Sequence, residues 1–395
     1  MLYVCFKTVL ICMLFAASNV YALDQKMSPW KVTHHWAKAK IKPTLIIPSQ
    51  SLRKLEQLKT LDNKDVIAAQ DAADYLESSE GAFALMLIKN GQIVYEGYKG
   101  RGKRLSSKFY SQSIAKSLTS LAIGKALCDG LIKSLDDAAG VYVPELNSSN
   151  LGKSSIKDLL RMSSGVYYTS FVGWPSYKSA VFGNDKKGHR VPNAEPAISN
   201  GTISISEMLW GVGLSEIGEV DVAKPGTKFV YKAYDPNALS KVIERASGKS
   251  LAKYFEEVIW SSIGAESAAE WSQDVDGANL GSAGFAAKLR DWGRLGIWVL
   301  EERKKDSCFG SYLREATVKQ IDNKQLFNGS VYSGRSYAGY GFLWWVDAKD
   351  NTPGFWGKGY AGQYFGFYPE GDKILIKFGY KDSPGLNKLF KSWAN

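Results

Sequence analysis

The sequence predicts an α+β protein, with one antiparallel sheet flanked by N- and C-terminal helices and a large, mainly helical inserted region. Three observations point to this fold class. Two β-type runs meet at Asn90-Gly91, a helical pattern with long polar loops extends from Ser111 to about Leu300, and further β-type runs follow Tyr340. In the simplest architecture, strands from both ends pair in one sheet and the terminal helices cover it.

The chain begins with a segment typical of a secretory signal peptide. Residues 1–22 carry Lys7, an apolar run and a small-residue site that ends at Ala22. A transmembrane anchor is the alternative, but it needs roughly 18 or more uninterrupted apolar residues, and this run is shorter. We therefore expect cleavage after Ala22, export to the periplasm and no stable membrane anchor.

A helix and a hairpin are predicted next. Apolar positions between Ser49 and Leu76 recur at helical spacing. The stretch "AFALMLIKNGQIVYEGY" then has two β-type runs around Asn90-Gly91, the strongest short hairpin signal. This hairpin would supply the first strands of the sheet.

The last part of the chain predicts three strands and a closing helix. The runs "YGFLWWVD", "GQYFGFYP" and "KILIKFGY" are aromatic and β-branched, and "GLNKLFKSWAN" has a helical pattern. The segment "GKGYAG" has the glycine spacing of a nucleotide-binding loop, but a hairpin follows it where that loop needs a helix. Its glycines must therefore serve another purpose.

These elements divide the chain into two lobes. Residues 23–110 and 326–395 would form the sheet-containing lobe, and residues 111–325 the mainly helical lobe. We expect the active site to lie between the two.

The charge composition limits the kinds of partner that the protein is expected to bind. The net charge is +11, but the basic residues are spread over the chain as short groups such as Lys186-Lys187. Without a clustered patch, a solvated surface is favoured over nucleic-acid binding.

Cys128 and Cys308 remain after signal cleavage, and they allow either one disulfide or a buried free thiol at Cys128, of which we favour the thiol.

Metal and histidine-based chemistry have little support. The chain has three histidines, His34, His35 and His189, without metal-ligand spacing, so no metal or other cofactor is expected. No serine has glycine at both flanking positions of a nucleophile elbow, G-x-S-x-G. A Ser-His-Asp triad would depend on one of those three histidines.

A lysine one helical turn after a serine offers another way to activate a nucleophile. Ser113 and Lys116 stand at i and i+3, so the amine can reach the hydroxyl. The S-x-x-K pattern recurs elsewhere, but Ser113 begins a helix that is apolar nearly all round and hence buried. Free amides at the helix start suit an oxyanion, and burial disfavours the ammonium form, so that Lys116 can act as a base. The alternative is a capping serine with a lysine that extends to solvent.

The chain resembles a known family at this point. Collinear motifs from about Ala82 to Tyr380 are similar to those of the serine β-lactamase and penicillin-binding-protein superfamily, in its class C-like esterase and 6-aminohexanoate-dimer hydrolase branch. They are "SQSIAKSLTSLAIGKALCDGLIKSLDDAAGVYVPEL", "SSIKDLLRMSSGV", "PGTKFVYKAYDPNALSKVIERASGKS", "SAGFAAKLRDWGRLGIWVL", "YGFLWWV" and "GKGYAGQYFGFYPEG".

The resemblance implies roles for several residues. Ser113 takes the place of the nucleophile, Lys116 that of its lysine and Tyr231 that of the tyrosine in Y-x-N, although Ala233 replaces the usual Asn. The third motif matches Gly357-Lys358-Gly359 as a wall of the cleft, with Lys358 pointing away from it because neighbouring strand residues alternate. The backbone N–H groups of Ser113 and Tyr360 would form the oxyanion hole.

The predicted function is that of an exported serine hydrolase that cleaves a small ester or amide. Aromatic residues, among them Tyr168, Trp174 and Trp345, would line the cleft, or else belong to the core. Two alternatives stay open: a β-lactamase or D,D-peptidase acting on penicillins or peptidoglycan peptides, and a non-catalytic envelope binding protein of the same fold. The number of subunits is left open.

Overall fold

The computed structural model describes most of the chain after residue 40. The described residues are 41–100, 104–166, 182–184, 190–192, 198, 201, 204–210, 223–323, 337–348, 354–381 and 385–394. The expected signal peptide, residues 1–22, lies outside them. Within the described part, none of the helices has the length and apolar character that a membrane crossing requires.

A seven-stranded antiparallel sheet joins the two ends of the chain, as predicted. The strand order is β3-β2-β13-β12-β11-β10-β9, and β2 from the N-terminal hairpin pairs with β13, where Leu87 lies opposite Leu375. The strands are β2 (Ala82–Lys89), β3 (Gln92–Tyr98), β9 (Tyr337–Tyr340), β10 (Trp345–Ala348), β11 (Phe355–Gly359), β12 (Gln363–Tyr368) and β13 (Lys373–Gly379).

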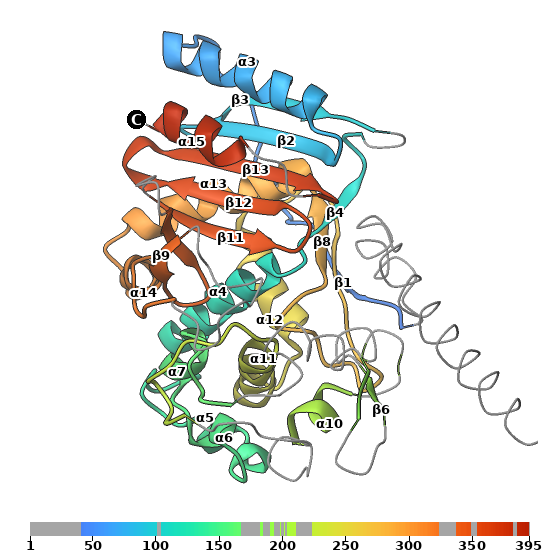
Figure 1. Cartoon of the computed structure of the whole chain (residues 1–395), viewed down its shortest axis with the longest axis vertical. Helices are drawn as coiled ribbons and strands as arrows, with labels where there is room; N and C mark the ends of the chain where they lie inside the picture. Colours follow the sequence, from blue (N-terminus) through green and yellow to red (C-terminus); the bar gives the residue numbers. More distant parts are fainter. Residues whose placement is uncertain are drawn as a thin grey trace, which may run out of the picture.

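Helices cover both faces of this sheet (Figure 1). The terminal helices α3 (Asn63–Ser78) and α15 (Leu386–Ala394) share one face, where Trp356 packs edge-on against Phe390 with ring centroids 4.6 Å apart. On the other face lies α13 (Leu289–Lys304), whose Trp292 contacts Phe365 at 5.4 Å. The α+β class predicted from the sequence is thus confirmed.

The first of these helices begins later than predicted. A helix was expected from Ser49, but residues 49–62 form no helix, and Leu58 N–H donates to the carbonyl of Ile93 in β3. The helix begins at Asn63 because the Asp62 side chain accepts the N–H of Asp65 and so caps it. Periodicity alone did not reveal this cap.

A second, four-stranded sheet was not predicted. Its order is β1-β7-β8-β4, and it brings together short segments that are distant in sequence. They are β1 (Thr44–Ile46), β7 (Ala269–Trp271), β8 (Phe285–Lys288) and β4 (Lys108–Tyr110). Strand β4 leads directly into the segment that carries Ser113, so this sheet helps to place the site.

The inserted region is mainly helical, as predicted. Its central helix, α11, lies beside α4 (Ile114–Cys128), which in turn lies beneath β11 (Figure 1). Besides α4, and α13 that packs on the sheet, the described α-helices of this region are α5 (Ala139–Tyr142), α6 (Asn150–Lys153), α7 (Ile156–Leu160), α10 (Ile205–Trp210), α11 (Tyr234–Ser247), α12 (Leu251–Val258) and α14 (Cys308–Ala316); a hairpin of β5 (Phe182–Asn184) and β6 (Arg190–Pro192) accompanies them. The lobe boundaries at 110 and 326 stay a prediction.

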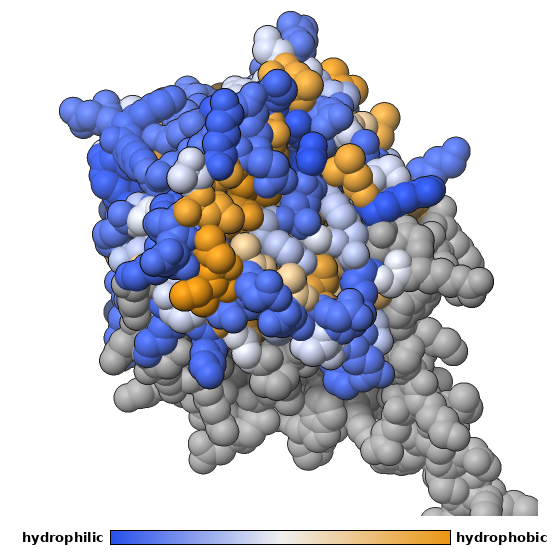
Figure 2. All heavy atoms as spheres, turned by 90° about the horizontal axis from the view of Figure 1, so that it is seen from above, coloured by the Kyte–Doolittle hydropathy of each residue, from blue (hydrophilic) through white to orange (hydrophobic). Residues whose placement is uncertain are grey.

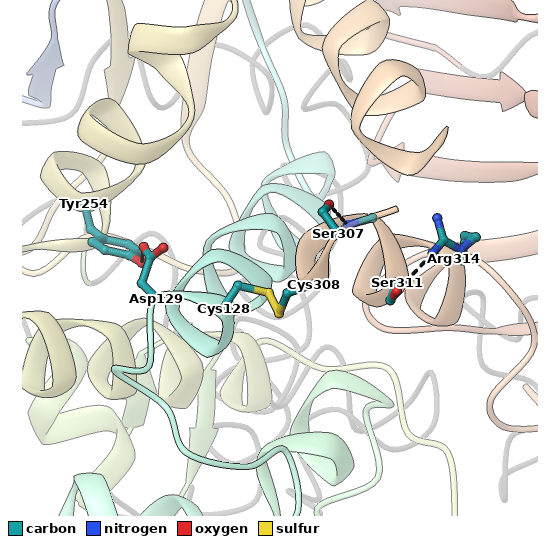
Figure 3. The surroundings of a disulfide bond; sticks show 8 residues. Cys128, Asp129, Tyr254, Ser307, Cys308, Ser311 and Arg314 are labelled. Carbon is teal, nitrogen blue, oxygen red and sulfur yellow. Dashed lines mark hydrogen bonds between the residues drawn. A yellow bond between two sulfur atoms is a disulfide. The ribbon is translucent and has the colours of Figure 1, made fainter. Parts of the chain in front are cut away.

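Cys128 and Cys308 form a disulfide, so the prediction of a free thiol was wrong. The bond joins the last residue of α4 to the first residue of α14 (Figure 3), across 180 positions in sequence. Nearby, Asp129 Oδ2 accepts from Tyr254 Oη at 2.8 Å. Apolar neighbours of Cys128 suggested a buried thiol, whereas the packing of α14 on α4 brings the partner cysteine within reach.

The face that includes α3 is mostly hydrophilic, with hydrophobic side chains in small groups (Figure 2). Val66 and Ile67 of α3 are among the exposed apolar residues of the molecule. We draw no functional conclusion from these small groups of exposed apolar side chains.

Candidate active site

A tight turn holds Ser113 at the start of α4. Before it, Ser111 N–H donates to the Phe285 carbonyl at 2.7 Å, and Phe285 N–H donates to Ser111 Oγ at 3.2 Å. Gln112 has φ +46°, a left-handed conformation that costs a residue with a side chain about 1 kcal/mol or more. Ser113 is the N-cap residue, yet its hydroxyl makes no capping hydrogen bond. The oxygen of Ser113 is therefore not committed to holding the helix.

Lys116 lies against Ser113, one turn along the helix. Its side chain is buried, with the residue 3 % exposed. Nζ donates to Ser113 Oγ at 3.0 Å and to the Ser282 carbonyl oxygen at 2.8 Å. The predicted pairing of these two residues is thus present in the structure, and the carbonyl of Ser282 is a neighbour that the sequence did not reveal.

Tyr231 completes this group. The Lys116 Nζ lies 5.0 Å from the centroid of the Tyr231 ring. The ring stacks on Trp345 at 5.4 Å and meets the edge of Tyr340 at 6.3 Å. Trp345 is 6 % exposed, so this residue, predicted to line the cleft, lies against Tyr231 as a support. Tyr168 and Trp174 lie outside the described residues.

A buried ion pair follows Tyr231 directly. Lys232 Nζ lies 3.0 Å from Asp235 Oδ2, and both side chains are buried. Asp235 also accepts from the Ser164 hydroxyl at 2.7 Å. Burial lowers the pKa of the Lys232 amine and raises that of the Asp235 carboxyl, against the attraction between them. The sequence shows a lysine and an aspartate three residues apart, but gives no sign that they are enclosed.

Strand β11 passes close to the start of α4. A Cβ on Gly359 would lie 2.4 Å from the Ser111 carbonyl oxygen, and one on Gly357 would lie 3.0 Å from Ile114 Cγ2. These two glycines face α4 and permit the close approach. Lys358 alternates to the other face, where its Nζ lies 5.0 Å from the ring centroid of Tyr364.

The turn after β11 carries Tyr360 at the surface, 43 % exposed. Two successive residues have left-handed backbones, Ala361 at φ +59° and Gly362 at φ +84°. Gln363 Nε2 donates to the Tyr360 carbonyl at 2.8 Å, and the buried Lys377 donates to the Gly362 carbonyl at 2.8 Å. The sequence analysis identified neither of these two hydrogen bonds, because a glutamine or a lysine in a strand is usually exposed to solvent.

The arrangement suits acyl transfer. A hydroxyl and a buried amine are hydrogen-bonded, and the Tyr231 ring lies 5.0 Å from the amine. A helix start and a strand beside them can supply backbone N–H donors. In the described residues, no three His, Cys, Asp or Glu side chains come together as a metal site would require. Fold and site define a protein of the serine hydrolase class.

The comparisons with known proteins agree. A model of the β-lactamase family matches residues 68–385, so the chain belongs to that family. Among curated proteins, no sequence matches it.

Solved structures with the same fold include several hydrolases. A Bacillus anthracis protein assigned as a 6-aminohexanoate-dimer hydrolase is 22% identical, with a TM-score of 0.68 over 92% of both chains. A D-stereospecific amidohydrolase from Streptomyces is 18% identical, with a TM-score of 0.58 over 82% of this chain and 96% of that one. A family VIII carboxylesterase is 14% identical, with a TM-score of 0.60 over 86% and 99%. At these identities the likeness is one of fold.

Proposed function

We propose that the protein is an exported hydrolase that cleaves a small ester or amide through an acyl-enzyme on Ser113. The observation that carries the proposal is the 3.0 Å hydrogen bond between Lys116 Nζ and Ser113 Oγ in a buried setting. An amine at this distance is within reach of the proton that the hydroxyl must lose. No cofactor is required.

The reaction has two halves. Ser113 Oγ attacks the substrate carbonyl carbon while its proton passes to Lys116 and through Tyr231 to the leaving alcohol or amine. The oxyanion forms opposite the backbone N–H groups of Ser113 and Tyr360. Water then attacks the ester carbon of the acyl-enzyme, its proton returns through the same two side chains, and the acid leaves as Ser113 is restored.

The substrate preference is for simple esters over penicillins. A penicillin or a D-Ala-D-Ala peptide has a carboxylate beside the scissile bond, and the family resemblance implies a Lys or His at position 357 to meet it. Gly357 carries no charge, and a Cβ there would press on Ile114 at 3.0 Å, so this strand has little room for a longer side chain. A charge-assisted hydrogen bond is worth about 1.5–3 kcal/mol, or roughly ten- to a hundredfold in selectivity.

The missing amide at Ala233 points the same way. An Asn at this position would orient a substrate amide, and Ala233 is a buried residue at the start of α11 that offers a methyl group. Esters make less use of such a contact than amides do, because an ester has no N–H to orient.

Export to the periplasm is part of the proposal. The signal-like residues 1–22 motivate it, and the Cys128–Cys308 disulfide supports it, because such bonds persist in oxidising compartments. Fractionation of cells that express the full chain would test it: recovery in the cytoplasm with residues 1–22 attached would refute export.

A substrate panel tests the activity. We expect kcat/KM for short p-nitrophenyl esters to exceed that for nitrocefin and benzylpenicillin, with aminohexanoate oligomers and D-amino-acid amides tested beside them. Efficient penicillin hydrolysis with negligible ester hydrolysis would instead favour a β-lactamase or D,D-peptidase. No turnover of any substrate and no labelling by a fluorophosphonate would favour a binding protein.

A further inference from the structure

The loop that meets Lys116 is itself held from two sides. Its residues 279–284 lie between α4 and α11. From α4, Thr119 Oγ1 donates to the Gly281 carbonyl at 2.9 Å and Lys116 Nζ donates to the Ser282 carbonyl at 2.8 Å. From α11, Asn237 Oδ1 accepts the Ser282 N–H at 3.1 Å. The peptide unit between Gly281 and Ser282 is thus bonded at both its C=O and its N–H.

This loop also lies in direct contact with α11. A Cβ on Gly281 would lie 2.0 Å from the Pro236 carbonyl oxygen, so only glycine allows the backbones to come this close. The close approach brings the Ser282 N–H within reach of the short Asn237 side chain. Asn237 is completely buried, and no described residue accepts a hydrogen bond from its Nδ2. The one bond that its amide group makes there is the bond to Ser282.

Asn237 lies near the start of α11, close to Ala233. It lies one turn after Ala233, and its N–H donates to the Ala233 carbonyl at 3.2 Å. Ala233, at the start of the helix, has no side-chain amide. Asn237 has one, and it contacts the Ser282 backbone. We propose that Asn237 is a positioning residue, which fixes the Ser282 backbone so that its carbonyl holds the Lys116 amine against Ser113.

This inference rests on the proposed function of Ser113 and Lys116. It assigns Asn237 no contact with the substrate. Loss of the acceptor would remove the hydrogen bond that Asn237 makes with the buried Ser282 N–H, and would let the carbonyl that holds Lys116 move. A misplaced base slows the chemical step but does not change substrate binding. We therefore expect the loss of Asn237 to lower kcat and to leave KM nearly unchanged.

The test compares two residues of the same helix. Asn237→Leu removes the acceptor, and we expect kcat for a p-nitrophenyl ester to fall about ten- to a hundredfold, with KM within about twofold of wild type. Ser240→Ala is the control: Ser240 is also buried in α11, and it donates to the carbonyl of Asn279 at 2.7 Å, in the same loop but three residues before Ser282. We expect it to keep kcat within about threefold.

Rescue by a conservative variant completes the experiment. Asn237→Asp keeps an oxygen facing the Ser282 N–H whether or not it is ionised, so we expect it to recover most of the kcat lost in Asn237→Leu. If Asn237→Leu does not fold, Asn237→Ala, which also lacks the acceptor, takes its place. The inference is overturned if the acceptor-free variant keeps wild-type kcat, if Ser240→Ala loses as much, or if Asn237→Asp recovers nothing. Activity that survives in Ser113→Ala would instead overturn the proposed function.

Discussion

Lys232 and Asp235 form an enclosed ion pair immediately after Tyr231, with Nζ and Oδ2 3.0 Å apart. Burial of two charges costs several kcal/mol per ion, and their attraction offsets this cost only while both are present. The pair therefore holds the chain between Tyr231 and α11 in one arrangement. Loss of either partner would leave an uncompensated buried charge and lower the free energy of unfolding.

This pair leads to a prediction on stability. Asp235→Asn leaves the Lys232 amine without its carboxylate, and we expect the free energy of unfolding to fall by about 3–5 kcal/mol. Lys232→Met combined with Asp235→Asn removes the buried charge as well and should be the more stable of the two variants. Urea unfolding at pH 7 measures both, and a double variant less stable than Asp235→Asn would contradict this view of the pair.

The proton relay predicts non-additive kinetics. Lys116→Ala and Tyr231→Phe should each reduce kcat by roughly 10³-fold or more, and the double variant should be little worse than either single one. The reason is that two residues of one proton path fail together. Steady-state kinetics on a p-nitrophenyl ester decide the matter: if the two losses multiply, Lys116 and Tyr231 act independently.

The disulfide predicts a stability effect without a large effect on catalysis. It closes a long stretch of chain, 180 positions, and we expect Cys128→Ser with Cys308→Ser to lose about 2–5 kcal/mol. Cys128 is the last residue of α4, whereas Ser113 lies at the opposite end of this helix. Because the disulfide is thus remote from Ser113, kcat measured well below the melting temperature should stay near that of wild type. Wild-type protein treated with a reductant should melt like the double variant, and an unchanged Tm after full reduction would contradict the prediction.

Acid should weaken the attachment of α3 to the sheet. The hydrogen bond from Lys89 of β2, at 2.7 Å, and that from the Asp65 N–H lower the pKa of Asp62 from 3.8 to about 2. A carboxyl whose pKa is lower in the folded state stabilises that state above about pH 3.8, and this contribution is lost as the pH falls toward 2.

Asp62→Asn isolates this effect. Asparagine caps a helix as well as aspartate does, but it does not titrate. We expect the Tm of wild type to fall more steeply between pH 4 and 2 than that of the variant. Parallel curves over this range would show that Asp62 contributes nothing to the acid dependence.

Much of the fold could be predicted from the local pattern of apolar and polar residues. The aromatic and β-branched runs around Leu87 and Leu375 predict strands, and their place at opposite ends of the chain predicts that they pair, as they do. Ser113 and Lys116 were found because i, i+3 spacing in a buried helix is a local property. The match to the β-lactamase family covers the same stretch of chain.

The remaining features depend on contacts that no local pattern encodes. The Cys128–Cys308 bond and the hydrogen bond from Ser282 to Asn237 join segments that only the folded chain brings together. The burial of Lys232 and Lys377 depends on what packs over them, and lysine is almost never enclosed. Sequence reasoning therefore passed over both lysines, Ser282 and Asn237, and favoured a free thiol at Cys128.

The central claim is that Ser113 is the nucleophile. Its most direct test is intact-mass measurement after treatment with a fluorophosphonate, with kcat for a p-nitrophenyl ester measured on the same samples. We predict that wild type gains one adduct, located on Ser113, and that Ser113→Ala gains none and loses roughly 10³- to 10⁶-fold in kcat. Equal labelling and equal activity in wild type and Ser113→Ala would contradict the account.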